Sequence, residues 1–316
     1  MNYPKSKLED LVTSDNSTDS TSGIVRKFIS QHPNLDLKLY EVKQRKGKTN
    51  AQNEAVRIAA NEFLVFTDAN SILDKNSIRE LMSSFTSEDI VYVTARLVYV
   101  EDFSSISNLG ESSYWDLELK IREIESRIQT ITAGNGALYA CRSKDYIEIP
   151  LIESHDSSFP LYFALQQKRA IANHDAIAFE KTGATVSDEF KRKVRMNRII
   201  LKFILPSVKI LNVFKMKSFT YFYLGHRTFR YLLWLNHFLL LLTSYLLRGL
   251  IFNKVVLILQ LFFYIAAILQ HFELLNFRVT KLAYYYSMTI YAQIKGVWNI
   301  INGKAKPIWD SVESTR

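Results

Sequence analysis

Cysteine is almost absent from the sequence, and this scarcity excludes two kinds of structure. The 316 residues include a single cysteine, Cys141, so the chain can form neither an intrachain disulfide nor a cysteine-rich zinc site. We expect this thiol to pack as a small apolar side chain. A signal peptide is lacking too, because Met1 to Asp10 is polar and no apolar core follows a basic start. Membrane insertion is therefore expected to depend on later helices.

A concentrated basic patch of the kind that binds nucleic acid is also missing. The formal net charge is +9, but the basic residues are dispersed or lie beside apolar runs. This distribution fits anionic lipids and phosphate-bearing substrates better than a nucleic acid. We therefore expect membrane lipids among the partners and no nucleic acid.

Apolar residues are unevenly distributed, which divides the chain. They make up 48% of it, yet most of the long apolar runs lie beyond Ile199. We expect a soluble α/β domain over residues 1–197, an interfacial amphipathic linker over 198–230, and a membrane region with a basic tail over 231–316.

Two or three transmembrane helices are expected in the membrane region. Tyr231 to Leu247 has no charge, and Val255 to Leu269 forms a second apolar candidate. Leu282 to Ile301 fits a spanning helix and an interfacial helix about equally well. Basic residues before the first span place the soluble domain on the cytoplasmic side, by the positive-inside rule. These are Lys202, Lys209, Lys215, Lys217, Arg227 and Arg230.

The first hundred residues alternate strand and helix patterns, which predicts a doubly wound, mostly parallel sheet. Its central stretch, Lys46 to Ser71, reads as a turn, an Ala-rich helix and a buried strand that ends at Asp68. Such sheets bind ligands outside the carboxyl ends of their strands. Asp15 ends another strand, so we expect both carboxylates at one edge.

Asp68 and Asn70 stand at i and i+2, so extended backbone would point both side chains the same way. Oxygen ligands at this spacing suit Mg²⁺ or Mn²⁺ on a diphosphate. The alternative interpretation is that this turn only caps the next helix.

A helix is predicted from Ser107 to Thr130, with an apolar stripe at helical spacing that we expect to face the core. The stripe consists of Leu117, Ile121, Ile124 and Ile128. Tyr114 and Trp115 lie beside it and are expected to pack rather than contact an acceptor. The turn that follows contains Gly134 and Gly136, where backbone can come close to a helix or a substrate.

Six segments, in order, resemble the family 2 glycosyltransferases, in particular the membrane-bound bacterial members similar to poly-N-acetylglucosamine, cellulose and hyaluronan synthases. They are LVTSDNSTDST, GKTNAQNEAVRIAANEFLVFTDANS, ESSYWDLELKIREIES, GNGALYACRS, HDSSFPLYFALQQKRAIANHDAIAFE and EFKRKVRM. The resemblance implies a GT-A fold for residues 1–197, a nucleotide-sugar donor, expected to be a UDP-sugar, and a divalent metal.

Five residues take donor-binding roles by this resemblance. Asp15 would contact a uracil-type base, and Asp19 would help to shape that pocket. Lys48 would lie near the base or the phosphates. Asp68 would hold the ribose or the metal, with Asn70 as a second metal ligand.

The resemblance also assigns residues to catalysis and to the diphosphate. Asp156 would be the general base of an inverting transfer, and the alternative is that it only caps a helix. Arg192 and Arg195 fall where the family has a Gln/Arg-x-x-Arg-Trp motif, and the alternative is a solvated basic pair. Met196 replaces the Trp, which argues against processive synthesis.

One departure from the family is that a strand and helix that precede Tyr3-Pro4 in relatives are not in this sequence. We therefore expect a truncated or mis-started gene product whose nucleotide pocket is incomplete. The neighbouring strands would then lack a partner.

The expected function is that of a hexosyltransferase-type enzyme in the bacterial inner membrane. It would transfer sugar to a polysaccharide or lipid-linked acceptor in envelope or exopolysaccharide synthesis, with possible partner subunits of a polysaccharide synthase. One alternative is an inactive remnant that only binds membrane or assembles with such subunits. Another is a nucleotide-binding α/β protein with a tail anchor.

Overall fold

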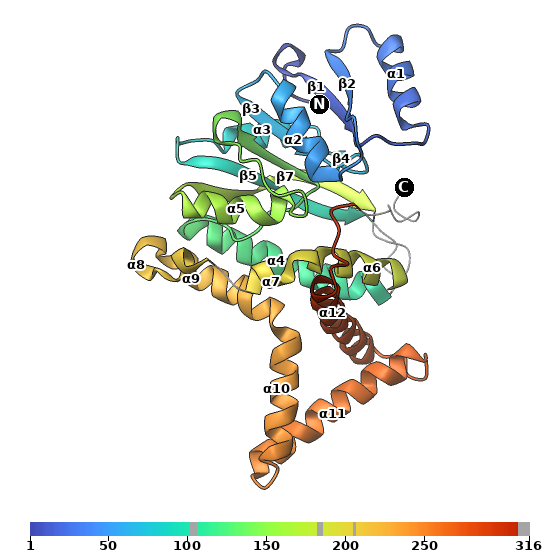
Figure 1. Cartoon of the computed structure of the whole chain (residues 1–316), viewed down its shortest axis with the longest axis vertical. Coiled ribbons are helices and arrows are strands. Elements are labelled where there is room, and N and C mark those ends of the chain that lie inside the picture. Colours follow the sequence, from blue (N-terminus) through green and yellow to red (C-terminus); the bar gives the residue numbers. More distant parts are fainter. Residues whose placement is uncertain (101–105, 182–185, 205–206, 309–316) are drawn as a thin grey trace.

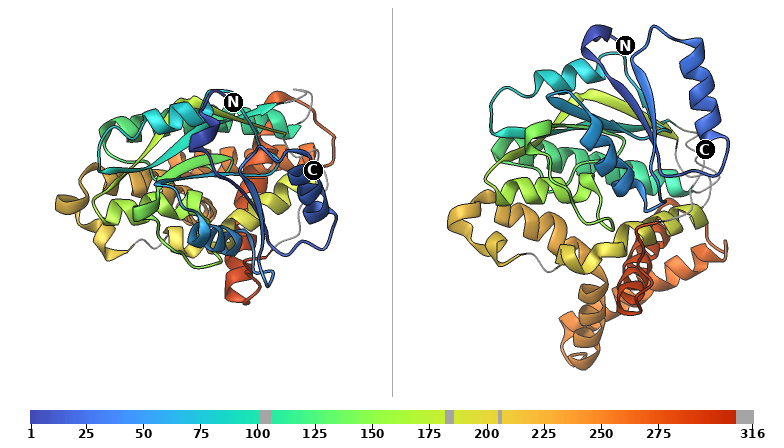
Figure 2. Two further views of the ribbon diagram at one scale, coloured as in Figure 1. Left: turned by 90° about the horizontal axis from the view of Figure 1, so that it is seen from above. Right: turned by 45° about the horizontal axis from the view of Figure 1, so that its top comes forward.

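The computed structural model describes residues 1–100, 106–181, 186–204 and 207–308, with backbone alone for 106–116. The expectations for the side chains of Tyr114 and Trp115 lie outside the described residues. Two sheets occupy one end of the molecule, a layer of helices lies beneath them, and two helices project away from that layer (Figure 1). The tilted view in Figure 2 shows the same order of layers.

The smaller sheet contains two parallel strands, β1 (Asp10–Ser14) and β2 (Leu37–Glu41). Helix α1 (Thr21–Gln31) connects them, as the alternation of strand and helix patterns predicts. A connection through a helix is what parallel neighbours require, since a tight turn can join only antiparallel strands. The carboxyl ends of both strands therefore lie at one edge.

The larger sheet has five strands in the order β3-β6-β5-β7-β4. Its strands are β3 (Phe63–Thr67), β4 (Ile72–Leu73), β5 (Ile90–Val100), β6 (Leu138–Arg142) and β7 (Arg169–Lys181). Only β5 and β7 pair in parallel, and the other three pairings are antiparallel. The expectation of a mostly parallel sheet is corrected to a mixed sheet, because β6 inserts between β3 and β5 in the reverse direction.

Five helices accompany the strands of this domain. They are α2 (Lys48–Ile58), α3 (Ser77–Ser83), α4 (Ile106–Ile128), α5 (His155–Leu165) and α6 (Val186–Met196). One core cluster contains Leu81 of α3, and another contains Phe159 and Phe163 of α5. Cys141 is fully buried in the second cluster, which confirms its expected packing role. Burial also raises the pKa of its thiol.

A pocket of about 570 Å³ lies between β1 and β3, which do not pair with each other in the described part of the chain. Consecutive residues line it on both sides, including Leu11, Val12 and Thr13 on one and 63–67 on the other. Side chains alternate across a strand, so consecutive lining residues mean that strand edges form the walls. Ala51 and Ala55 of α2 complete the enclosure.

Helix α4 contradicts the prediction that its apolar stripe faces the core. Leu117, Ile124 and Ile128 are 59%, 54% and 57% exposed. The side chains that α4 buries are charged instead, with Glu118 at 3% and Glu125 at 1% exposure. Periodicity identified the stripe correctly, but the side of the helix that packs on the protein is the polar one.

The segment after α6 is built from short helical pieces. They are η3 (Asn197–Ile199), α7 (Ile200–Ile204), η4 (Val208–Leu211), α8 (Val213–Met216), α9 (Ser218–Tyr223) and the π-helical η5 (Leu224–Phe229). Ile210, Met216 and Phe219 are buried against Leu161 of α5, so this segment is anchored to the domain above it.

Three longer helices follow, α10 (Leu233–Leu246), α11 (Ile251–His271) and α12 (Arg278–Ile301). Among the described helices, α11 alone is long and apolar enough to cross a membrane, while α10 is apolar but shorter. Helix α12 packs on the domain. A Cβ added at its Gly296 would lie 2.6 Å from Cβ of Asn197, so backbone and side chain are in close contact there.

Candidate active site

Three of the predicted site residues converge on the turn at Gly136, which precedes β6. A Cβ added at Gly136 would lie 3.5 Å from Nζ of Lys48, 3.6 Å from Oδ2 of Asp68 and 3.9 Å from Cγ of Asp156. These side chains come from the start of α2, the end of β3 and the start of α5. Pairing of β3 with β6 sets the arrangement, because it places Leu138 opposite Thr67.

Lys48 and Asp68 form an ion pair at this point. Lys48 begins α2 directly after Gly47, whose φ of 101° lies in the region that favours glycine. Asp68 donates its backbone N–H to the carbonyl of Ala137 at 3.3 Å, which fixes the end of β3. Both side chains remain about one third exposed, so a ligand can reach them.

Asp15 lies in the same pocket as Lys48 and Asp68, at the wall formed by β1. Its carboxylate accepts hydrogen bonds from the backbone N–H groups of Lys46 at 3.1 Å and Gly47 at 2.8 Å. It therefore holds the turn that presents Lys48. Asp19 is placed differently, because its carboxylate accepts from the N–H and hydroxyl of Thr21 at the start of α1 and does not line this pocket.

Asp156 lies in the first turn of α5, directly after the buried His155. His155 bonds Tyr139 through Nδ1 at 2.8 Å and Tyr146 through Nε2 at 3.0 Å, and its ring stacks on Phe159 at 4.3 Å. Burial, together with the nearby Lys48 charge, lowers the pKa of His155 to about 3, so the ring is neutral at neutral pH. This packing fixes the backbone that carries Asp156.

The Gly-containing turn is tied to α5 as well as to β6. Gly134 donates its N–H to the carbonyl of Asp156 at 2.8 Å. Asn135 is buried, and its N–H donates to Thr94 Oγ1 at 3.1 Å. The position of Gly136 against the carboxylates is therefore set by main-chain hydrogen bonds.

Of the two predicted arginines, Arg195 is the one whose charge interacts with both Asp68 and Asp156. Burial and the charges of Arg192 and Arg198 lower the pKa of Arg195, while Asp68 and Asp156 act in the opposite direction. Arg192 instead makes a two-fold contact with the buried Glu189, at 2.6 and 2.9 Å. Arg192 thus braces α6, and the charge of Arg195 acts on the carboxylates of the site.

Two further residues at the site were not predicted. Arg198 interacts electrostatically with Asp156, and its Nε donates to the carbonyl of Ile152 at 2.6 Å. Glu180 lies near the end of β7 and accepts a hydrogen bond from Ser71 at 2.5 Å. Burial raises the pKa of Glu180, and the charge of Asp68 adds to that effect. The sequence held a signal for Arg198, because it continues the three-residue spacing of Arg192 and Arg195.

The residues predicted to hold a divalent metal fit a site completed by a substrate. Asn70 is exposed in the turn that follows Asp68. Within the described residues no group of three or more acidic, histidine or cysteine side chains could hold a metal alone. Mg²⁺ is usually bound through one or two carboxylates plus substrate phosphates, so Asp68 with Asn70 is compatible with it.

The segment that follows α12 reaches the same pocket, where Ile308 forms part of the lining (Figure 1). A Cβ added at Gly47 would lie 2.7 Å from the carbonyl oxygen of Pro307. Strand β1 and the segment after α12 therefore both line this site, since β1 forms one wall and the segment at Pro307 lies over the turn at Gly47.

The two glycines of the turn should respond differently to alanine. A Cβ at Gly134 would lie 2.2 Å from the hydroxyl of the buried Tyr92, so Gly134→Ala should cost about 1–3 kcal/mol of unfolding free energy. The nearest atoms around Gly136 lie at ordinary contact distances, so Gly136→Ala should fold normally but narrow the site. Thermal unfolding and nucleotide binding of both variants check this. Equal destabilisation by both would contradict it.

Comparison with known proteins adds a family and a fold. The sequence model of "Glycosyl transferase family 2" matches residues 1–177. A poly-beta-1,6-N-acetyl-D-glucosamine synthase of Staphylococcus epidermidis is 27% identical over 85 residues, which are 27% of this chain and 19% of the relative. An N-acetylglucosaminyltransferase of Azorhizobium caulinodans is 29% identical over 134 residues, 41% of this chain and 33% of the relative. The matches thus span at most a third of these relatives.

A solved structure resembles the chain over most of its length. It is a mannosyltransferase from Pyrobaculum calidifontis in complex with GDP-Man and Mn²⁺, with a TM-score of 0.64 and 18% sequence identity. The alignment covers 96% of this chain and 80% of that structure. At this identity the likeness shows the fold, which is GT-A-like.

Proposed function

The chain belongs to glycosyl transferase family 2, and we propose that it transfers a sugar from a nucleotide diphosphate to an acceptor hydroxyl with inversion at the anomeric carbon. The observation that carries the proposal is the convergence of Lys48, Asp68 and Asp156 around Gly136. A cation, a metal-binding carboxylate and a base that meet at one side-chain-free position are the groups that such a transfer requires.

In this proposal Asp156 is the general base. Its carboxylate takes the proton of the acceptor hydroxyl while the hydroxyl oxygen forms a bond to the anomeric carbon. The bond between that carbon and the diphosphate oxygen breaks, and the nucleoside diphosphate leaves with the electron pair. Asp156 is half-buried, and the helix start that carries it is held by the hydrogen bonds of His155.

Negative charge develops on the departing diphosphate, and Lys48 and Arg195 are the cations placed to stabilise it. Asp68 and Asn70 would hold a Mg²⁺ or Mn²⁺ ion, which neutralises phosphate charge when bound. Asp15 closes the pocket on the nucleotide side, where we propose a UDP-sugar as donor. Asp19 would shape this pocket only indirectly, by holding the start of α1, since its carboxylate accepts the hydrogen bond of the Thr21 N–H there.

We propose a membrane-bound enzyme whose acceptor is a polysaccharide or a lipid-linked sugar. Residues 1–197 would form the cytoplasmic transferase domain, 198–230 an interfacial linker and 231–316 the membrane region of the bacterial inner membrane. The apolar helix α11 supports attachment to a membrane, because only 11% of its most apolar stretch is buried in the protein. Envelope or exopolysaccharide synthesis is the process that this acceptor class implies.

A binding or assembly subunit without turnover is the alternative function. One observation favours this alternative function. In the described chain, β1 and β3 line the pocket with edges that are not paired to each other. Such a chain would keep the membrane contacts and the nucleotide pocket but would lack a fully closed donor site.

Sugar transfer by purified full-length chain in lipid vesicles separates the two functions. Radiolabelled UDP-, GDP- and dTDP-sugars are supplied with Mn²⁺ and with a membrane extract as acceptor. We expect label from one donor to enter a lipid or polysaccharide fraction, and chelation of the metal should abolish it. Nucleotide binding without turnover of any donor would contradict the transferase proposal and support the subunit.

A further inference from the structure

Helix α4 buries three charged side chains, while its apolar stripe faces outward beside the exposed Lys120, Glu123 and Arg127. Glu118, Arg122 and Glu125 are all at most 4% exposed, while Leu117, Ile124 and Ile128 are each more than half exposed. A surface helix of a water-soluble protein shows the opposite pattern. Contiguous exposed apolar residues of this kind mark a surface that is covered by a partner or by lipid.

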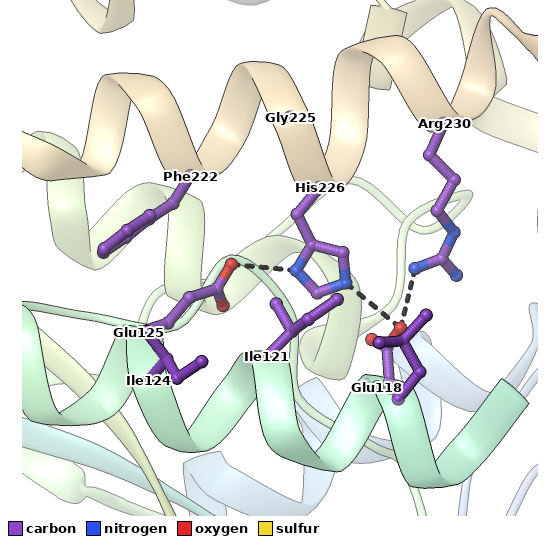
Figure 3. A pocket seen from close by; sticks show the side chains of 9 residues that line it. Glu118, Ile121, Ile124, Glu125, Phe222, Gly225, His226 and Arg230 are labelled. Atoms are coloured by element: carbon purple, nitrogen blue, oxygen red, sulfur yellow. Dashed lines mark hydrogen bonds and ion pairs between the residues drawn. The ribbon is translucent and has the colours of Figure 1, made fainter.

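The inward face of α4 is held in this orientation by a buried charge network with η5 (Figure 3). His226 bonds Glu125 through Nδ1 at 2.8 Å and Glu118 through Nε2 at 3.1 Å, and Arg230 contacts Glu118 at 2.7 Å. Although burial opposes it, these carboxylates raise the pKa of His226 to about 9. Charged partners inside the protein therefore prevent α4 from rotating its apolar stripe inward.

A groove of about 430 Å³ opens between α4 and η5 above this network. Its sides are apolar, with Leu117, Ile121 and Ile124 from α4 and Phe222 from α9. Gly225 adds a gap in the η5 wall, because nothing lies within 4 Å of a Cβ added there. Part of the apolar stripe of α4 therefore lines the groove, and the rest of the stripe forms the surface beside it.

The neighbouring segment extends this apolar surface. Val208 is 83% exposed, Phe214 92% and Tyr221 68%. Figure 1 places α4 and α9 in the layer between the sheets and the projecting α10 and α11. The projecting helices also carry exposed apolar residues, including Phe252 and Phe262 of α11.

The charge of the same segment favours anionic lipid over a protein partner. Residues 190–272 contain 13 lysines and arginines and no aspartate or glutamate. Lys209, Lys215 and Lys217 alternate with the exposed apolar residues of η4 and α8. Basic side chains interspersed with apolar ones are typical of helices that lie at the boundary between anionic headgroups and acyl chains.

We propose that the outward face of α4, together with η4, α8 and α9, rests in the headgroup–acyl boundary of an anionic bilayer, with a lipid acyl chain in the groove between α4 and η5. This inference rests on the proposed membrane attachment but not on sugar transfer. It makes α4, a helix of the transferase domain, part of the membrane-bound surface, and so fixes the distance of the active site from the bilayer.

The test is a fluorophore placed in the groove of the full-length chain. Ile124→Cys is labelled with an environment-sensitive dye, and Cys141 can stay because a buried thiol is unreactive. The chain is added to phosphatidylcholine–phosphatidylglycerol vesicles that carry a spin label on the acyl chain. Ile24→Cys is the matched control, since Ile24 is an isoleucine of similar exposure on α1.

We expect quenching at position 124 to be at least about threefold stronger than at position 24, because such surfaces sit about 5–10 Å into the boundary. Omitting phosphatidylglycerol should weaken it. Flotation of the unlabelled chain with the same vesicles measures attachment separately. Flotation without quenching at 124 would overturn this inference alone, and so would crosslinking of that position to a second copy. Failure to float would overturn the proposed membrane attachment as well.

Discussion

Asp156→Asn is expected to slow sugar transfer by about 10²–10⁴-fold, the usual contribution of a general base. The amide cannot accept the proton of the acceptor hydroxyl, so the nucleophile stays weakly activated. Donor binding should be nearly unchanged, because the cations and Asp68 that we propose to contact the diphosphate remain. Initial rates at saturating donor, together with a nucleotide titration of the same sample, measure both effects.

Ser157→Ala is the matched control, since Ser157 lies in the same turn of α5 and its hydroxyl contacts Ser154 at 2.8 Å. It should leave the transfer rate within a few-fold of the parent. Thermal unfolding of both variants should resemble that of the parent, because His155 and its tyrosine partners still fix the helix start. A normal rate in Asp156→Asn would remove this residue from catalysis and leave only its position at the helix start.

Asp68→Asn is expected to abolish the dependence of nucleotide binding on Mn²⁺. Changes in residues that merely support metal ligands typically cost about 10–100-fold in metal affinity, so loss of the ligand itself should reach at least about 100-fold. The fold should tolerate the change, because the Lys48–Asp68 pair is partly exposed and such pairs contribute about 0–1 kcal/mol. Calorimetric titration of UDP with and without Mn²⁺ measures the effect without any need for turnover.

Asp36→Asn removes an exposed carboxylate just before β2 and should leave the titration unchanged. Asn70→Ala should weaken the metal dependence less than Asp68→Asn, since a neutral amide attracts the cation less strongly than a carboxylate does. If Asp68→Asn binds UDP and Mn²⁺ like the parent, the metal assignment is wrong and Asp68 only pairs with Lys48.

The elements around the site could be predicted because their signals are local. The apolar run before Asp68 has the length and composition of a strand. Gly47 marks the start of the helix that precedes this strand. The mixed sheet could not be predicted in this way. Its defining step is the insertion of β6 between β3 and β5, and this long-range pairing leaves no pattern within either strand.

The roles of the side chains could likewise be predicted only where the signal is local in the sequence. Spacing placed Arg192 and Arg195 on one helix, but only the structure shows that Glu189 engages the first and that the charge of the second interacts with Asp68 and Asp156. Glu180 had no local signal, because its place beside Ser71 depends on the pairing of β4 with β7. For α4, an apolar stripe has the same period whether it faces a protein core or lipid.

The pocket between β1 and β3 has two walls formed by strand edges, and this affects how a ligand there can be detected. Amide hydrogens on two facing strand edges exchange with solvent water through local motions, whereas β5 is paired on both sides and should exchange only when the domain unfolds. A nucleotide that fills the pocket should slow exchange along both edges. Hydrogen-exchange mass spectrometry could therefore rank candidate donors before any acceptor is known.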